Sequence, residues 1–162
     1  MSKSIKPIIG ITMGDASGIG PEIIVKALSS GEIYEICRPI VIGDAKVMTA
    51  ATKFAEAPLR VNAVDKVDEA TFERGVLDVL DLKNLDASEI EVGRVNRASG
   101  KAAAEFVQKA VELALKGEIH AIATAPLNKE AMNMAGYHYP GHTEILAHLT
   151  KTEKYAMMLV AG

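Results

Sequence analysis

The chain has 162 residues, and 49% of them are hydrophobic, which is enough to form one globular domain with an apolar core. Its net charge is -3, from 18 basic and 21 acidic residues spread along the sequence, so no basic stripe is available to follow a nucleic-acid backbone. Cys37 is the only cysteine, which excludes an internal disulfide and a cysteine-based zinc site and fits a reducing compartment.

The N-terminal stretch MSKSIKPIIGITMGD contains too short an apolar run for a signal peptide and has no small-residue cleavage site. Nowhere do about 18 apolar residues follow one another, as a membrane-spanning helix requires. We therefore expect a cytoplasmic protein that has neither a membrane nor a nucleic acid as its partner.

Short apolar runs alternate with longer stretches of helical period, which is typical of a parallel sheet covered by helices and predicts an α/β fold. Residues 7–13 (PIIGITM) are expected to form a buried strand, followed by a glycine-containing turn. A helix over 21–29 comes next, and Gly31 is expected to end it. Residues 38–44 (RPIVIGD) predict a second strand, and Asp44 is a good N-cap for the helix that follows.

Two further strands are predicted over 59–64 (LRVNAV) and 75–82 (GVLDVLDL), and the polar connection 65–74 is expected to be a solvated loop or a short surface helix. Ser99 is expected to open the clearest helix of the sequence, and Gly117 to end it. One stripe of this helix is apolar and is expected to lie in the core: Ala103, Phe106, Val107, Ala110, Val111 and Ala114.

Residues 119–126 (IHAIATAP) predict a strand that runs into a long loop over 124–144. The last apolar run, 155–162 (YAMMLVAG), resembles another central strand. A parallel strand without a following helix is unusual in a complete domain, so we expect this chain to be the N-terminal part of a longer sequence.

The segment 13–22 (MGDASGIGPE) is the first candidate site, because its glycines let the backbone approach a ligand and a helix begins directly after them. The spacing G-x-x-x-G-x-G fits neither a Rossmann fingerprint nor a P-loop, and a plain strand-to-helix turn explains it equally well. Asp15 and Glu22 could point into a site, or could simply favour the helix start.

Thr124, Asn128 and Lys129 form the second candidate site, because they follow a strand end and offer a hydroxyl, an amide and a cation to an anionic substrate. The alternative is that Asn128 caps a helix over KEAMNM and that Lys129 is solvated.

The third candidate lies in GYHYPGHTE, where His138 and His142 are four residues apart. Pro140 and Gly141 lie between them, so the two histidines cannot form the helical pair of a zinc protease. His142 and Thr143 instead lie at the mouth of an apolar helix, a position that suits substrate binding. Packing or surface positions are expected for the other histidines and for two tyrosines: His120, His138, His148, Tyr137 and Tyr139.

Three segments together, MGDASGIGPEI, TAPLNKEAM and AGYHYPGHTEILA, closely resemble the 4-hydroxythreonine-4-phosphate dehydrogenase family, PdxA. The helix SGKAAAEFVQKAVELA stands before the second segment, as it does in that family. The resemblance runs from Ile8 to Gly162 and covers only the N-terminal portion of the family's longer sequence. One departure is Ala16-Ser17, where the family usually has Pro-Ala. With YAMML near the end, this resembles the branch acting on 4-phospho-D-threonate or 4-phospho-D-erythronate.

The resemblance implies a two-domain α/β/α homodimer, similar to isocitrate and isopropylmalate dehydrogenases, with its active site at the dimer interface. Residues 1–162 would be the N-terminal portion of that fold. The resemblance also implies NAD bound without a Rossmann fingerprint, and a divalent metal (zinc, magnesium or cobalt) held by three histidines beyond Gly162. His142 and Thr143 are implied to bind the substrate, and Asn128 and Lys129 are weaker candidates for the same pocket. Catalytic and cofactor-binding residues stay unassigned.

The implied reaction oxidises the secondary alcohol of a phosphorylated hydroxy acid by hydride transfer to NAD, after which the β-keto acid loses carbon dioxide. The substrate would be 4-phosphohydroxy-L-threonine, as in vitamin B6 (pyridoxal 5'-phosphate) biosynthesis, or 4-phospho-D-threonate or -erythronate. Because the metal ligands would lie elsewhere, this chain alone is expected to be inactive. One alternative is a truncated, non-catalytic fragment that binds substrate weakly or not at all. Another is an acyl or phosphoryl transferase of related architecture, against which the GHTE segment argues.

Overall fold

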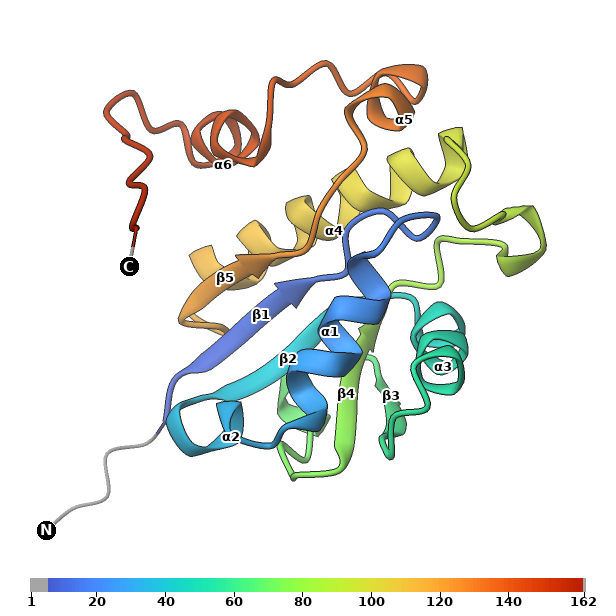
Figure 1. Ribbon diagram of the computed structural model, residues 1–162. Helices are drawn as coiled ribbons and strands as arrows, with labels where there is room; N and C mark the ends of the chain where they lie inside the picture. The colour runs from blue at the N-terminus through green and yellow to red at the C-terminus, as the bar shows by residue number, and fades with distance from the viewer. Residues whose placement is uncertain (1–5, 162) are drawn as a thin grey trace, which may run out of the picture.

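The computed structural model describes residues 6–161 and contains a five-stranded sheet in the order β3-β4-β2-β1-β5 (Figure 1). Every pair of neighbouring strands is parallel, so the predicted α/β fold is confirmed. The strands are β1 (Ile8–Thr12), β2 (Arg38–Gly43), β3 (Arg60–Val64), β4 (Val76–Asp81) and β5 (Ala121–Thr124).

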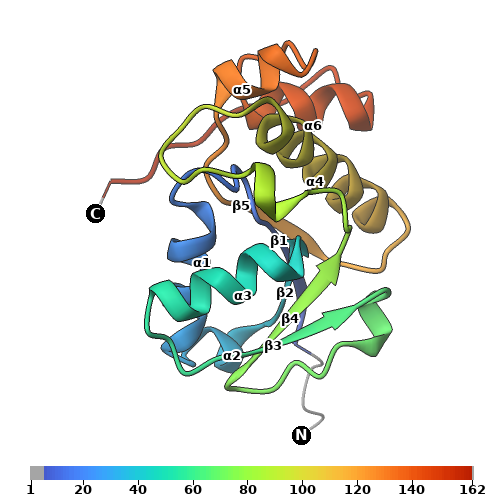
Figure 2. The ribbon, with the colours of Figure 1, turned by 90° about the vertical axis from the view of Figure 1, so that its right-hand side faces the viewer.

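Helices cover both faces of the sheet, as Figures 1 and 2 show. On one face α1 (Gly20–Ser29) packs beside α3 (Ala45–Phe54), and on the opposite face α4 (Arg97–Leu115) contacts β1, β2 and β5. Two shorter helices, α5 (Lys129–Met134) and α6 (His142–Thr150), pack on α4. The smaller elements are helix α2 (Ile33–Ile36) and the 3₁₀ turns η1 (Val67–Glu69) and η2 (Ala87–Glu89). Within the described residues, no helix combines the length and the apolar character that crossing a membrane requires.

Most helix ends lie where the sequence predicts them. The Asp44 carboxylate caps α3 by accepting hydrogen bonds from the N–H groups of Lys46 and Val47. Gly117 follows α4 with φ +75°, a conformation that glycine adopts without the strain a side chain brings. The predicted start of α4 is wrong by two residues, because the Asn96 side chain caps the helix by accepting from the Ser99 N–H.

The connection 65–74 contains the short 3₁₀ turn η1, so the prediction of a loop or short surface helix is confirmed. It is fastened to the sheet by Asp78, a buried residue of β4. The Asp78 carboxylate accepts hydrogen bonds from the N–H groups of Thr71 and Phe72 at 3.2 and 2.7 Å, and from the Asn62 side chain at 2.7 Å.

The predicted strand over 155–162 is wrong for residues 155–161, which have no regular structure, and Gly162 lies outside the described residues. Lys151 ends α6 in a left-handed conformation, and the chain beyond it does not pair with the sheet. The side chains of Met158 and Leu159 are both 85% exposed. An apolar run forms a strand only where it completes its hydrogen bonds with a neighbouring strand, and residues 155–161 pair with neither edge strand of the sheet, β3 or β5.

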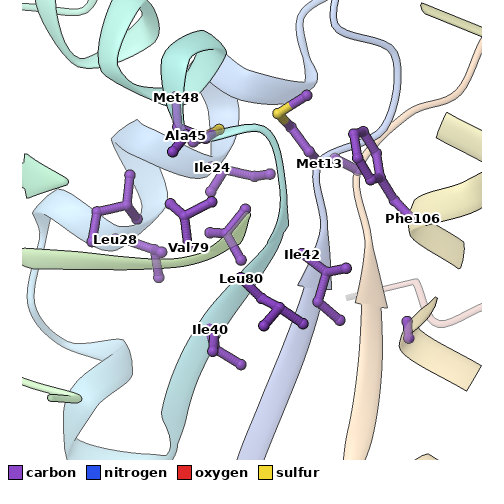
Figure 3. Close-up of a cluster of buried hydrophobic side chains, with 14 of the residues drawn as sticks. Met13, Ile24, Leu28, Ile40, Ile42, Ala45, Met48, Val79, Leu80 and Phe106 are labelled. Atoms are coloured by element: carbon purple, nitrogen blue, oxygen red, sulfur yellow. The ribbon is translucent and has the colours of Figure 1, made fainter. Parts of the chain in front are cut away.

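The main core lies between the sheet and both layers of helices (Figure 3). Ile24 and Leu28 come from α1, Met48 comes from α3, and Phe106 comes from α4. The predicted apolar stripe of α4 is buried except for Ala114, which is partly buried. Residues of this stripe belong to two clusters. Phe106 and Ala110 are part of the main core, whereas Val107 packs with residues of α5 and α6 in a second, smaller cluster: Ala104, Val107, Met132 and Ile145.

Helix α4 approaches α5 closely at Gly100, where an added Cβ would lie 2.1 Å from the backbone carbon of Ala131. We expect Gly100→Ala to lower the free energy of unfolding by about 1–3 kcal/mol, because the backbone of α5 would have to move. At an unhindered helix position the same change stabilises by roughly 0.5–1 kcal/mol. Urea unfolding measures the effect, and Lys101→Ala at the neighbouring exposed position should stay within about 0.5 kcal/mol of the wild type. A stabilised Gly100→Ala variant would contradict the close contact between these helices.

Candidate functional site

The carboxyl ends of β1 and β5 lie side by side, since Thr12 pairs with Thr124 in the parallel register. From these ends the chain leaves in opposite directions: β1 leads to α1 on one face of the sheet, and β5 leads to α5 on the α4 side (Figure 1). In open parallel sheets ligands bind outside such a point of divergence. The loops 13–19 and 125–128 are therefore the first candidates for a ligand site.

The two loops are joined backbone to backbone. The Asp15 N–H donates a hydrogen bond to the carbonyl oxygen of Pro126 at 2.9 Å. Gly14 has φ +72°, and an added Cβ would lie 2.3 Å from the same oxygen. The glycine at this position thus allows one loop to approach the other, which is the role of a strand-to-helix turn and not of a ligand cradle.

Asp15 lies at the centre of a buried hydrogen-bond cluster and is 5% exposed. Its carboxylate accepts hydrogen bonds from the Ser17 N–H at 3.0 Å and from the hydroxyl of Ser99 in α4. The Ser17 N–H also donates to the Ser99 hydroxyl oxygen at 3.1 Å. Glu22, the other acidic residue of this segment, pairs on the surface with Lys26. Asp15 does not lie at the start of α1, which begins at Gly20, and its carboxylate instead bonds to Ser17 and Ser99.

Asn128 caps α5, since its side-chain oxygen accepts a hydrogen bond from the Ala131 N–H at 3.0 Å. The alternative interpretation of this residue is therefore confirmed, although the cap leaves the amide nitrogen of Asn128 available for a ligand. Lys129 and Thr124 are exposed, and Lys129 has no ion-pair partner among residues 6–161.

His142 and Thr143 are the first two residues of α6 and are half-buried. Gly141, the residue before them, has no side chain with which to cap the helix, so the first-turn N–H groups have no side-chain acceptor there. The Nε2 atom of His142 is buried and has no hydrogen-bond partner among the described residues. Burial also lowers the pKa of His142 below its ordinary value, so the ring is neutral at pH 7.

The remaining histidines have structural or surface positions, as expected. His138 is exposed and lies 3.2 Å from the Asn133 side-chain oxygen, and His120 Nδ1 accepts a hydrogen bond from the Ile8 N–H. The His148 ring packs against Tyr139 with the ring centres 5.6 Å apart. Among residues 6–161, no group of three or more His, Cys, Asp or Glu side chains is arranged to hold a metal ion.

The four predicted substrate-binding residues lie at the starts of two helices that share one support. Leu127 and Met132, on either side of Asn128 and Lys129, belong to the small cluster on α4 that also holds Ile145 of α6. Within the described residues, no hydrogen bond joins His142 or Thr143 to Asn128 or Lys129. The structure therefore places the two pairs on a common scaffold but does not close them into one pocket.

Sequence reasoning missed Ser17 and Ser99 as parts of the site's framework. Ser99 is 84 residues from Asp15 along the chain, and a serine at a helix start is explained by local capping alone. No local signal distinguishes a capping serine from one that bonds to a distant carboxylate.

The family model "Pyridoxal phosphate biosynthetic protein PdxA" matches residues 35–162. A Clostridium botulinum protein, provisionally named a D-threonate 4-phosphate dehydrogenase, is 51% identical over 91% of this chain and 44% of its own length. The D-threonate 4-phosphate dehydrogenase of Cupriavidus necator is 46% identical over 96% of this chain and 46% of its own length.

A solved structure of a 4-hydroxythreonine-4-phosphate dehydrogenase from Burkholderia phymatum is also similar to this chain. The two superpose with a TM-score of 0.93 at 45% identity, over 98% of this chain and 48% of the other. The chain thus spans about half the length of the relatives that it matches. Since the family model covers most of the sequence and the fold of a solved relative covers nearly all of it, the chain belongs to the PdxA family.

Proposed function

We propose that the protein containing this chain oxidises the secondary alcohol of a phosphorylated hydroxy acid by hydride transfer to NAD, with subsequent loss of carbon dioxide. Membership of the PdxA family and the names of its relatives support a dehydrogenase acting on a substrate such as D-threonate 4-phosphate. The observation that carries the assignment of the site is the buried Nε2 of His142, which has no partner among residues 6–161 and lies beside Thr143 at the start of α6.

His142 is suited to holding a substrate oxygen. A buried polar atom without a partner costs free energy, and a ligand that supplies the partner recovers it. Because the ring is neutral, Nε2 either donates to or accepts from the substrate, according to its tautomer. The Thr143 hydroxyl and the first-turn N–H groups of α6 add further donors for a carboxylate or phosphate oxygen. These residues would bind and orient the substrate.

Asn128 and Lys129 would contribute to the same pocket from α5. The cap fixes the orientation of the Asn128 side chain, so its NH₂ group is directed away from the helix backbone. The exposed Lys129 ammonium supplies positive charge for a phosphorylated substrate. The amide of Asn128 and the charge of Lys129 would both make the binding free energy of an anionic ligand at this edge of the sheet more favourable.

NAD would accept the hydride in the proposed reaction, and a divalent metal would act as a Lewis acid. The described residues do not fit a metal site by themselves, and no step is assigned through a metal here. The loop 13–19 does not offer a dinucleotide cradle either, because Gly14 faces Pro126. A homodimer, a cytoplasmic location and a part in vitamin B6 biosynthesis complete the proposal, and the description of the matching family model supports the last of these.

The His142→Ala variant of the full-length enzyme should lower kcat/KM for 4-phospho-D-threonate by about 5- to 150-fold, corresponding to roughly 1–3 kcal/mol. The reason is the loss of one hydrogen bond to a charged ligand. His138→Ala is the matched control and should stay within about twofold, since His138 is exposed. Steady-state kinetics and metal analysis of the same preparations provide the test. Loss of stoichiometric metal from a folded His142→Ala protein would make His142 a metal ligand and would contradict the proposed role.

Burial of His142 also predicts a pH dependence of stability. Its pKa in the folded chain lies below the ordinary 6.5, so below about pH 6.5 the unfolded chain binds more protons than the folded one. The contribution of the neutral His142 ring to the free energy of unfolding is therefore complete above about pH 6.5 and is lost as the pH falls below it. We expect His142→Gln, which cannot titrate, to lose less stability than the wild type between about pH 7.5 and 5.5. Urea unfolding at both pH values measures this, and equal losses in the two proteins would show that His142 is not buried.

A further inference from the structure

The Asp15 cluster joins segments that are far apart in the sequence. Asp15 belongs to the β1–α1 loop. Its carboxylate accepts a hydrogen bond from the hydroxyl of Ser99, which lies in the first turn of α4. Asp15, Ser17 and Ser99 are 5%, 2% and 0% exposed, so water competes little for these hydrogen bonds. The Ser17 carbonyl oxygen also accepts from the Gly93 N–H at 2.7 Å, which adds the connection before α4 to the cluster.

The same cluster reaches the 125–128 loop and the start of α5 by two routes. Along the first, the Asp15 N–H holds the Pro126 carbonyl, two residues before Asn128. Along the second, Ser99 fixes the turn of α4 that contains Gly100, against which the α5 backbone packs. Both routes end at the start of α5, where Asn128 accepts from the Ala131 N–H.

We infer that Asp15 and Ser99 are positioning residues, whose hydrogen bond sets α5 and its cap residue Asn128 in the place required for substrate binding. This inference rests on the proposed function. Neither residue has to touch the substrate, because both act through α4 and through the 125–128 loop. A hydrogen bond weakens steeply when its geometry is distorted, so displacement of Asn128 would weaken the binding of the substrate.

Asp15 acts here as a hydrogen-bond acceptor and not through its charge. Its carboxylate accepts from an N–H and an O–H, and among residues 6–161 it has no ion pair. Asparagine retains the oxygen that both donors use, whereas alanine removes it. The Asp15→Asn and Asp15→Ala pair therefore separates positioning from any direct electrostatic role in the reaction.

The test uses the full-length enzyme with NAD and 4-phospho-D-threonate. We expect Ser99→Ala and Asp15→Ala to raise KM about tenfold and to leave kcat within about threefold, because the site is displaced but its chemical groups remain. Asp15→Asn should retain the wild-type KM within about twofold. Ser29→Ala is the matched control, since its hydroxyl bonds within α1, away from this site. General destabilisation would reduce the folded, active fraction and hence the apparent kcat, without this effect on KM.

Hydrogen exchange supplies a readout that does not depend on turnover. In Ser99→Ala the Ala131 amide should exchange at least about tenfold faster than in the wild type, because α5 loses its fixed position. If the wild type does not oxidise 4-phospho-D-threonate, the proposed function fails, and the Ala131 amide still decides the positioning role. Unchanged KM and unchanged exchange in Ser99→Ala would overturn the inference. A tenfold rise of KM in Asp15→Asn would do the same, and this variant decides the question if Ser99→Ala does not fold.

Discussion

The buried hydrogen bond between Asp15 and Ser99 is the constraint on which the arrangement of the candidate site depends. It connects the turn after strand β1 to the start of α4, across 84 residues of sequence. A carboxylate with little access to water must have its oxygens satisfied, so its donors are held in place. The glycine before Asp15 then allows the two loops at the carboxyl ends of β1 and β5 to meet backbone to backbone.

Helix α4 connects the sheet to the helices α5 and α6, because it has apolar residues on more than one side. Phe106 faces the sheet and belongs to the main core, while Val107 packs against α5 and α6 in the smaller cluster. The outer helices thus rest on α4 and not on the sheet. This position half-buries His142 and explains why its pKa is lowered and its Nε2 has no partner within the described residues.

The chemistry of the described residues is that of binding and orientation. They supply a neutral imidazole, a hydroxyl, an amide and an ammonium group at the starts of α5 and α6, but no set of metal ligands. Such groups suit a phosphorylated, oxygen-rich substrate. The chain spans about half the length of its relatives.

The sequence by itself determined the features that local chemistry controls. Alternating apolar runs predicted the parallel α/β fold, Asp44 and Gly117 marked helix ends, and the segments around Asn128 and His142 identified the family. Contacts distant in sequence were decided only by the tertiary structure. The local sequence predicts a helix start at Ser99, whose hydroxyl also bonds to Asp15, and it predicts a strand over 155–161, which does not pair with the sheet. Propensity and periodicity depend on neighbouring residues, whereas a buried hydrogen bond or a strand pairing requires a partner that only the folded chain brings near.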